Sequence, residues 1–265
     1  MKEEYFPQNE YHTPPDMPHK LGDRLAMGTR VYFMARFIGY LIQSRRIAVR
    51  GEYDRAAWVH TSYQFFNLIE QCGGRFHITG LEHFRVLKEP VVIISNHMST
   101  LETMVFPFII ASVLDAVYVV KEELVNGKFF GPLMRARDPI AVGRSNPRED
   151  FKRVITEGCE KLAKGISVII FPQHTRKVEF IPEEFNTIGV KLASKAGVRV
   201  VPIAIKTDWW GNSSVAKAFG PIDRSKPIHI AFGPPMSVQG TGKQENQQII
   251  EFIQAHLARW AAEEK

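Results

Sequence analysis

A histidine and a glutamate five residues apart are the first side chains in this sequence that could do chemistry together. His97 and Glu102 follow the apolar run Val91–Ile94. A histidine exchanges protons near neutral pH, and a neighbouring carboxylate can hold its ring in one tautomer. The pair therefore suggests a general base. A plainer interpretation stays open, in which Glu102 only caps a helix opened by Ser99 and His97 is an ordinary turn residue.

The apolar run before His97 indicates how the pair is positioned. Val91–Ile94 consists of four successive β-branched residues, which suit a parallel strand buried on both faces. His97 would then lie in the turn between this strand and the next helix. Open α/β sheets bind their ligands at the carboxyl ends of the strands. The sequence therefore places His97 at a ligand-binding edge.

Short apolar runs alternate with amphipathic stretches from Arg75 to the C-terminus. This alternation predicts an α/β fold with a largely parallel central sheet flanked by helices. We expect strands at 76–78, 91–94, 117–120, 140–142, 167–171, 198–205 and 229–232, and helices at 99–113, 147–165, before Gly197 and at 244–262.

Cationic side chains follow several of these predicted strands. Lys121, Arg144 and the segment Pro172–Lys177 each come just after an apolar run. Arginine offers a planar fork that matches phosphate, and lysine adds a point charge. Any one of them alone would usually be a solvated surface charge. Together with His97 at one sheet edge, they favour transfer chemistry on an anionic substrate.

An amphipathic segment precedes the α/β region. From Arg24 to Arg46 apolar residues recur at helical spacing, and a second helix, capped by Asp54, ends at Gly73–Gly74. The apolar part 31–42 would span about 18 Å as a helix, too short for a bilayer core of about 30 Å. The two helices could lie at a membrane interface or simply pack on the domain. The apolar face comprises Met27, Val31, Phe33, Met34, Phe37, Ile38, Leu41 and Ile42.

Composition limits the class of protein. The chain has 265 residues and a formal charge of +6, so it should attract nucleic acid, a membrane surface or a phosphorylated substrate. It carries no nucleic-acid-binding motif.

The cysteines and the N-terminus indicate the compartment. Cys72 and Cys159 form neither a disulfide framework nor a metal cluster, and residues 1–16 lack the apolar core of a signal peptide. We expect a cytoplasmic protein divided into an N-terminal tail and helix pair, 1–73, and an α/β domain, 74–265.

Four sequence blocks, in their order, resemble the glycerolipid acyltransferases, which include lysophosphatidic acid and glycerol-3-phosphate acyltransferases. Asn96–Glu102 is similar to the family's His-x4-Asp block, Gly131–Arg144 to the second, Phe171–Arg176 to Phe-Pro-Glu-Gly-Thr-Arg, and Val200–Ile203 to the fourth. Phe185–Gly189 is similar to a further family segment. The resemblance covers about residues 76–236. It implies an α/β domain, in some members with an amphipathic N-terminal helix pair that docks on a membrane.

The resemblance also implies roles for the residues. His97 would remove the proton from an acceptor hydroxyl that attacks an acyl thioester of coenzyme A or acyl carrier protein, and Glu102 would hold the imidazole. Arg144 and Arg176 would bind the acceptor's phosphate, helped by Lys177. Backbone N–H groups after His97 would stabilise the oxyanion. Further substrate-binding residues would be Lys121, Gln173, His174 and Thr175.

The expected partners follow from the same resemblance. They are an acyl thioester donor, with acyl carrier protein as one candidate, a lipid acceptor and an anionic membrane surface, but no nucleic acid. Acyl-CoA or acyl-ACP would be a co-substrate, and no metal or other cofactor is expected. The protein would act on the membrane surface without spanning the bilayer, in phospholipid biosynthesis.

Three departures from the family pattern affect these expectations. Glu102 stands where aspartate is usual, and Gln173 and His174 replace a glutamate and a glycine. A non-catalytic lipid-binding module is the alternative function, since it would keep the cations and the membrane helices without needing His97 and Glu102. A serine hydrolase is disfavoured because no Gly-x-Ser-x-Gly pentapeptide occurs, and no glycine-rich nucleotide-binding loop is present.

Overall fold

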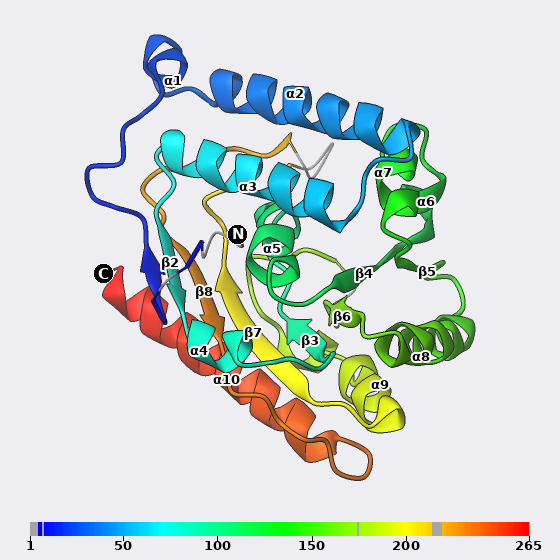
Figure 1. Cartoon of the computed structure of the whole chain (residues 1–265). Helices are drawn as coiled ribbons and strands as arrows, with labels where there is room; N and C mark the ends of the chain where they lie inside the picture. The colour runs from blue at the N-terminus through cyan, green and yellow to red at the C-terminus, as the bar shows by residue number, and fades with distance from the viewer. Residues whose placement is uncertain (1–4, 7, 174, 214–218, 265) are drawn as a thin grey trace.

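An eight-stranded sheet forms the centre of the computed structural model, which describes residues 5–6, 8–173, 175–213 and 219–264 (Figure 1). The strand order is β1-β2-β8-β7-β3-β6-β4-β5. From β7 to β5 all neighbours are parallel, whereas β8 runs antiparallel to β7. The strands are β1 (Tyr11–His12), β2 (Phe76–Thr79), β3 (Val92–Ser95), β4 (Ala116–Lys121), β5 (Ile140–Val142), β6 (Ser167–Ile170), β7 (Val200–Lys206) and β8 (Ile228–Phe232).

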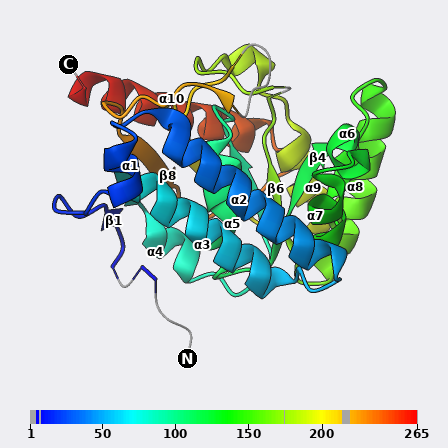
Figure 2. The ribbon, with the colours of Figure 1, turned by 90° about the horizontal axis from the view of Figure 1, so that it is seen from above.

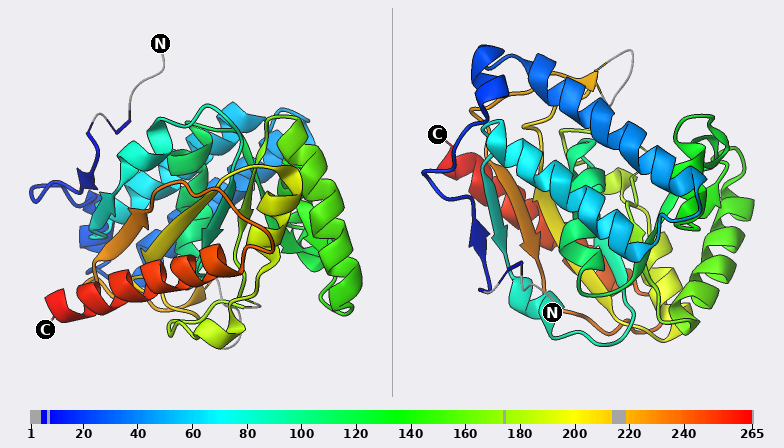
Figure 3. Two further views of the ribbon diagram at one scale, coloured as in Figure 1. Left: turned by 90° about the horizontal axis from the view of Figure 1, so that it is seen from below. Right: turned by 45° about the horizontal axis from the view of Figure 1, so that its top comes forward.

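Helices cover both faces of this sheet. One face carries α2 (Arg30–Val49), α3 (Arg55–Gln71) and α5 (Leu101–Ala111), and the other carries α8 (Pro147–Ala163), α9 (Ile188–Ala196) and α10 (Lys243–Glu263) (Figures 1 and 3). The remaining short helices are α1 (Leu21–Leu25), α4 (Leu81–Arg85), α6 (Glu122–Asn126), α7 (Gly131–Ala136) and a 3-10 turn at Pro182–Glu184. The α/β fold with a largely parallel sheet is confirmed.

The alternation of side chains along β3 divides the core into two hydrophobic clusters. Ile93 packs with the α2, α3 and α5 side, while Val92 and Ile94 pack with the α8, α9 and α10 side. Successive strand residues point to opposite faces, so a strand that is apolar throughout needs a helix layer on each side. Because parallel strands end at the same edge, the turns after β3, β6, β4 and β5 lie together.

The N-terminal helices differ from their sequence-based prediction in one respect. The expected helix from Arg24 to Arg46 is interrupted where Met27 (φ 51°) and Gly28 (φ 67°) adopt left-handed backbone, and the segment forms two helices, α1 and α2.

Several elements were not predicted, among them β1, α4, α6 and α7. The helix expected from Ser99 begins at Leu101.

The apolar face of α2 contains two stripes that point in different directions. Phe33, Phe37 and Leu41 are buried in the same hydrophobic cluster as α3, α5 and one face of the sheet. A second stripe is exposed and is formed by Val31, Ile38, Ile42 and Val49. Figure 2 shows α2 beside α3, on the outside of the helix layer. No helix in the described part of the chain is long and apolar enough to cross a membrane.

Candidate active site

His97 and Glu102 are joined by a hydrogen bond at the carboxyl end of β3. His97 Nδ1 lies 2.8 Å from Glu102 Oε1, which also accepts the backbone N–H groups of Met98 and Ser99, each at 2.8 Å. The Glu102 side chain is 0% exposed and that of His97 is 15% exposed. One carboxylate oxygen therefore caps the start of α5 and also holds the imidazole, so the two interpretations of the sequence describe the same contact.

The environment of Glu102 favours its charged form. Burial would raise the pKa of this carboxyl, but the hydrogen bond and charge of His97, together with bonds from Thr207 and the Ser99 backbone, lower the pKa below its usual value. A buried carboxylate that stays ionised can stabilise an imidazolium beside it. With Nδ1–H directed at Glu102, Nε2 is the nitrogen left to accept a proton.

The third sequence block holds His97 from two sides. The imidazole stacks on the ring of Phe171 with centroids 4.2 Å apart, and the backbone N–H of Lys177 donates to the His97 carbonyl at 3.0 Å. Gln173, 3% exposed, accepts the His97 backbone N–H through Oε1 at 2.7 Å, and its buried Nε2 has no partner among the described residues. Through Oε1, Gln173 orients the turn that carries His97, and its contact with substrate stays a prediction.

Strand β7 supplies two contacts that the sequence analysis missed. The Asn96 side chain bonds both the N–H and the carbonyl of Ile205, each at 2.9 Å, and ties the ends of β3 and β7 together. Thr207, the first residue after β7, donates to Glu102 Oε2 at 2.7 Å. The signal was present, since Thr207 is a polar residue following an apolar run, the same criterion that selected Lys121 and Arg144.

Arg176 is a cation that lies beside this pair and interacts electrostatically with Glu102. Its guanidinium donates to the hydroxyl of Thr100, which directly precedes α5. Burial lowers the pKa of Arg176, and the negative charge of Glu102 acts in the opposite direction. A guanidinium is still protonated after such a shift. A partly desolvated cation whose direct partner is a neutral hydroxyl is suited to bind an anion.

The other predicted cations lie at the same sheet edge in different surroundings. Lys177 pairs with Glu184, and Lys121, at the end of β4, lies 3.7 Å from Glu123. Arg144 follows β5, which is three strands away from β3 in the sheet. At ordinary strand spacing, the axes of β3 and β5 are about 14 Å apart. Thr175 follows Gln173 in the same turn region, and His174 lies outside the described residues.

The turn at Arg144 is unusual in its backbone. Arg144 has a φ of 65°, and the carboxylate of Asp150 on α8 accepts the N–H groups of Gly143 and Arg144 at 2.9 and 2.8 Å. Burial lowers the pKa of Arg144, while Glu123 and Asp150 act in the opposite direction. A left-handed non-glycine residue costs free energy and often marks a functional turn.

Three of the backbone N–H groups after His97 are already engaged within the protein, which leaves them unavailable for the oxyanion site that we had expected. Those of Met98 and Ser99 donate to Glu102, and that of Leu101 donates to the Ser99 hydroxyl at 3.0 Å. These donors point inward and are used to fix the carboxylate and the helix start. A developing oxyanion would need another donor, and Arg176 is the cation positioned beside this turn.

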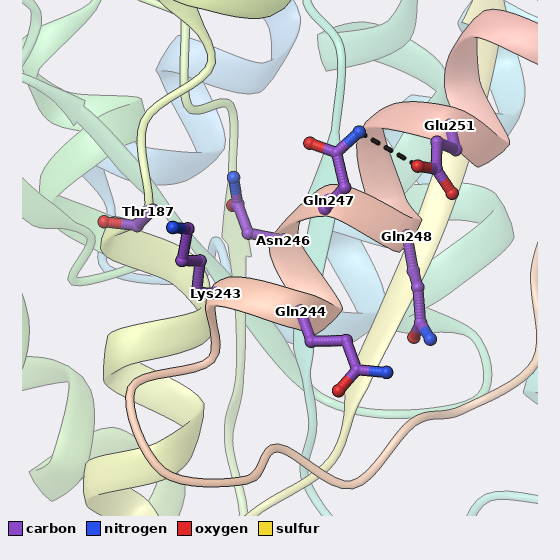
Figure 4. A pocket seen from close by; sticks show the side chains of 7 residues that line it. All are labelled: Thr187, Lys243, Gln244, Asn246, Gln247, Gln248 and Glu251. Atoms are coloured by element: carbon purple, nitrogen blue, oxygen red, sulfur yellow. Dashed lines mark hydrogen bonds between the residues drawn. The ribbon is translucent and has the colours of Figure 1, made fainter.

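A separate groove lies on the other side of the sheet, between the starts of α9 and α10 (Figure 4). Its volume is about 690 Å³. None of the predicted site residues lines it, so it is distinct from the His97 site. The lining residues are Thr187, Lys243, Gln244, Asn246, Gln247, Gln248 and Glu251.

The α/β fold carries a histidine–carboxylate pair and an arginine at one sheet edge, an arrangement suited to transfer chemistry on an anionic substrate. A family model described as Acyltransferase matches residues 75–206. The chain is 33% identical over 193 residues to a 1-acyl-sn-glycerol-3-phosphate acyltransferase of Pseudomonas aeruginosa, covering 72% of this chain and 70% of that protein. The protein therefore belongs to the acyltransferase family, which confirms the resemblance seen in the sequence.

Two further comparisons agree. A 1-acyl-sn-glycerol-3-phosphate acyltransferase of Limnanthes alba is 29% identical over 183 residues, covering 66% of this chain and 59% of that protein. The crystal structure of the LPA acyltransferase PlsC from Thermotoga maritima matches with a TM-score of 0.64 at 17% identity, over 90% of this chain and 96% of that one. This structural likeness shows the shared fold.

Proposed function

We propose that this enzyme transfers a fatty acyl group from an acyl thioester to the free hydroxyl of lysophosphatidic acid, a step of phospholipid synthesis. The observation that carries the proposal is the buried, ionised Glu102 hydrogen-bonded to His97, with Arg176 on the adjoining turn. The relatives named above as 1-acyl-sn-glycerol-3-phosphate acyltransferases support the choice of acceptor.

In the proposed reaction, His97 Nε2 accepts the proton of the acceptor hydroxyl as its oxygen attacks the thioester carbonyl carbon. Glu102 stabilises the imidazolium that forms. The tetrahedral intermediate then breaks its carbon–sulfur bond, and the imidazolium returns the proton to the leaving thiolate. The products are an ester and a free thiol. Stacking on Phe171 keeps the imidazole in one orientation throughout.

Two arginines would bind the acceptor's phosphate. Arg176 lies beside the start of α5, where the positive end of the helix dipole adds to its charge. Arg144 follows β5, three strands away at the same edge, and would contact the acceptor's phosphate from that side. Lys177 contributes less, because its ammonium is paired with Glu184. Gln173 positions His97 by accepting its backbone N–H through Oε1.

The lipid acceptor requires access to a membrane, and the exposed stripe on α2 provides a surface for it. Val31, Ile38, Ile42 and Val49 lie within about 40° of one another around the helix, on the side away from Phe33 and Phe37. Exposed arginines flank them, including Arg30 and Arg46. This N-terminal element, within residues 1–73, would dock on anionic lipid while residues 74–265 carry out acyl transfer.

The experiment that tests the proposal measures thiol release from acyl-CoA and from acyl-ACP with a panel of acceptors. We expect release that depends on lysophosphatidic acid and yields an ester product. Thiol release of equal rate without any acceptor would indicate a thioester hydrolase. Binding of lysophosphatidic acid without release from either donor would favour the non-catalytic lipid-binding module.

A further inference from the structure

Thr207 contacts the acid of the His97–Glu102 pair from a strand that is distant in the sequence. Its hydroxyl donates to Glu102 Oε2 at 2.7 Å across 105 residues of sequence. The Ser99 hydroxyl lies 3.0 Å from the same oxygen and 3.1 Å from Thr207 Oγ1. Thr207 is 0% exposed, so water does not compete for this bond.

The two oxygens of Glu102 are held in different ways. Oε1 receives three donors, all from the turn between His97 and Ser99. Among the described residues, Oε2 receives the hydroxyls of Ser99 and Thr207 and no further donor. Glutamate has one more torsion than the aspartate of the family pattern, so the Oε1 contacts alone leave the carboxylate free to rotate. The two hydroxyls at Oε2 restrict that rotation, and Thr207 is the one that comes from outside the turn.

We infer that Thr207 is a positioning residue for acyl transfer, which fixes the plane of the longer acid so that Glu102 Oε1 stays directed at His97. This inference rests on the proposed function, since it assigns Thr207 a role in the same site. Thr207 reaches no reacting atom, and it acts through Glu102.

Thr207 is itself rigidly held. Its backbone N–H donates to the sulfur of Met98 at 3.2 Å. The residues that follow include Trp209 and Trp210, both 0% exposed. Their indoles pack edge-on against Phe33 of α2, with ring centroids 5.5 and 5.0 Å apart. A β-branched side chain on an anchored backbone has few rotamers, so the hydroxyl keeps its direction.

The first test compares Thr207→Val, which keeps the shape and removes the hydroxyl, with Thr207→Ser, which keeps the hydroxyl. We expect Thr207→Val to lower kcat by about 10- to 100-fold, the usual effect of losing a hydrogen bond to a charged group. The KM values for donor and acceptor should change little, and Thr207→Ser should restore most of kcat. Thr61→Val is the matched control, because Thr61 is a buried threonine of α3 whose hydroxyl donates to the Ala57 carbonyl and accepts from Ser44 of α2, with no contact to Glu102.

The second test is a double-mutant cycle with Glu102→Asp. The shorter acid should no longer reach Thr207, so Thr207→Val should cost less than about threefold in that background. An equal loss in both backgrounds would show that Thr207 acts on the fold and not through Glu102. Wild-type kcat in Thr207→Val would overturn the inference while leaving the proposed function intact. A wild-type chain without acyl transfer would instead refute the proposed function.

Discussion

Glu102→Gln should separate the charge of this residue from its structural role. Oε1 of the new amide can keep the donors from His97, Met98 and Ser99. The amide NH2 would face two hydroxyls, those of Ser99 and Thr207, which can rotate to accept from it. The substitution therefore removes a negative charge at nearly constant shape and with the hydrogen bonds satisfied. We expect the start of α5 to remain folded.

The size of the effect follows from the distance between the charges. The imidazolium and carboxylate centres would lie about 4 Å apart, which corresponds to about 4 kcal/mol at an effective dielectric constant of about 20. At about 1.4 kcal/mol per factor of ten, Glu102→Gln should lower kcat by about 10³-fold. Glu102→Ala should behave differently, because it leaves buried donors of the turn without an acceptor, each costing about 1–3 kcal/mol of folding stability.

The assay is steady-state thiol release at saturating donor and acceptor, with Tm measured on the same samples. Glu70→Gln is the matched control, since Glu70 is a buried carboxylate that accepts from Tyr11 and Thr13 far from His97. It should keep wild-type kcat. If Glu102→Gln retains its Tm and loses less than about tenfold in kcat, the carboxylate charge does not stabilise the reacting imidazole and the reasoning fails.

Three further predictions concern the substrate, the membrane and pH. Arg176→Ala and Arg144→Ala should raise the KM for the acceptor, lower kcat, or both, with a much smaller change in the KM for the thioester. Replacing Val31 or Ile42 by glutamate should weaken binding to anionic vesicles, and wild-type binding should fall at high salt. Burial lowers the pKa of His229 to about 3, so the unfolded chain binds a proton more readily than the folded one below pH 6.5. The free energy of unfolding should therefore fall by up to about 1.4 kcal/mol per pH unit as the pH decreases below 6.5. His229→Phe should flatten this slope, measured by urea titrations at a series of pH values.

Each of these predictions has a control and a contradicting result. Arg259→Ala on α10 is the arginine control, and a change in the donor's KM alone would show that the roles of Arg144 and Arg176 are assigned wrongly. Phe151→Glu on α8 is the vesicle control, since Phe151 is an exposed apolar side chain on the other side of the sheet. An unchanged acid slope in His229→Phe would mean that His229 is protonated in the folded protein.

The sequence predicted β2 to β8 because most of these strands are short apolar runs, whereas the two-residue strand β1 carries no such signal. The edge that gathers His97 and Arg176 followed from the rule that parallel strands end together. The sequence could not show that β8 turns antiparallel, because a strand buried on both faces reads the same in either direction. Nor could it show the contact of Thr207 with Glu102, which depends on β7 lying beside β3.

The N-terminal helices show the same limit more clearly. A wide apolar face on 24–46 could belong to a membrane surface or to the core, and periodicity does not distinguish them. In the structure Phe33 and Phe37 pack on Trp210, whereas Val31 and Ile42 are exposed, so each alternative describes part of the helix. Deleting residues 1–73 would therefore remove core side chains, and point substitutions in the exposed stripe test membrane contact better.

The measurement that tests the central claim most directly is the turnover of His97→Ala with acyl-CoA and lysophosphatidic acid. A positioned general base contributes about 10²- to 10⁴-fold in rate. We expect kcat to fall by at least that range while circular dichroism shows the wild-type fold, because the backbone contacts of residue 97 with Gln173 and Lys177 do not depend on the ring. A correctly folded His97→Ala protein with near wild-type turnover would contradict the account.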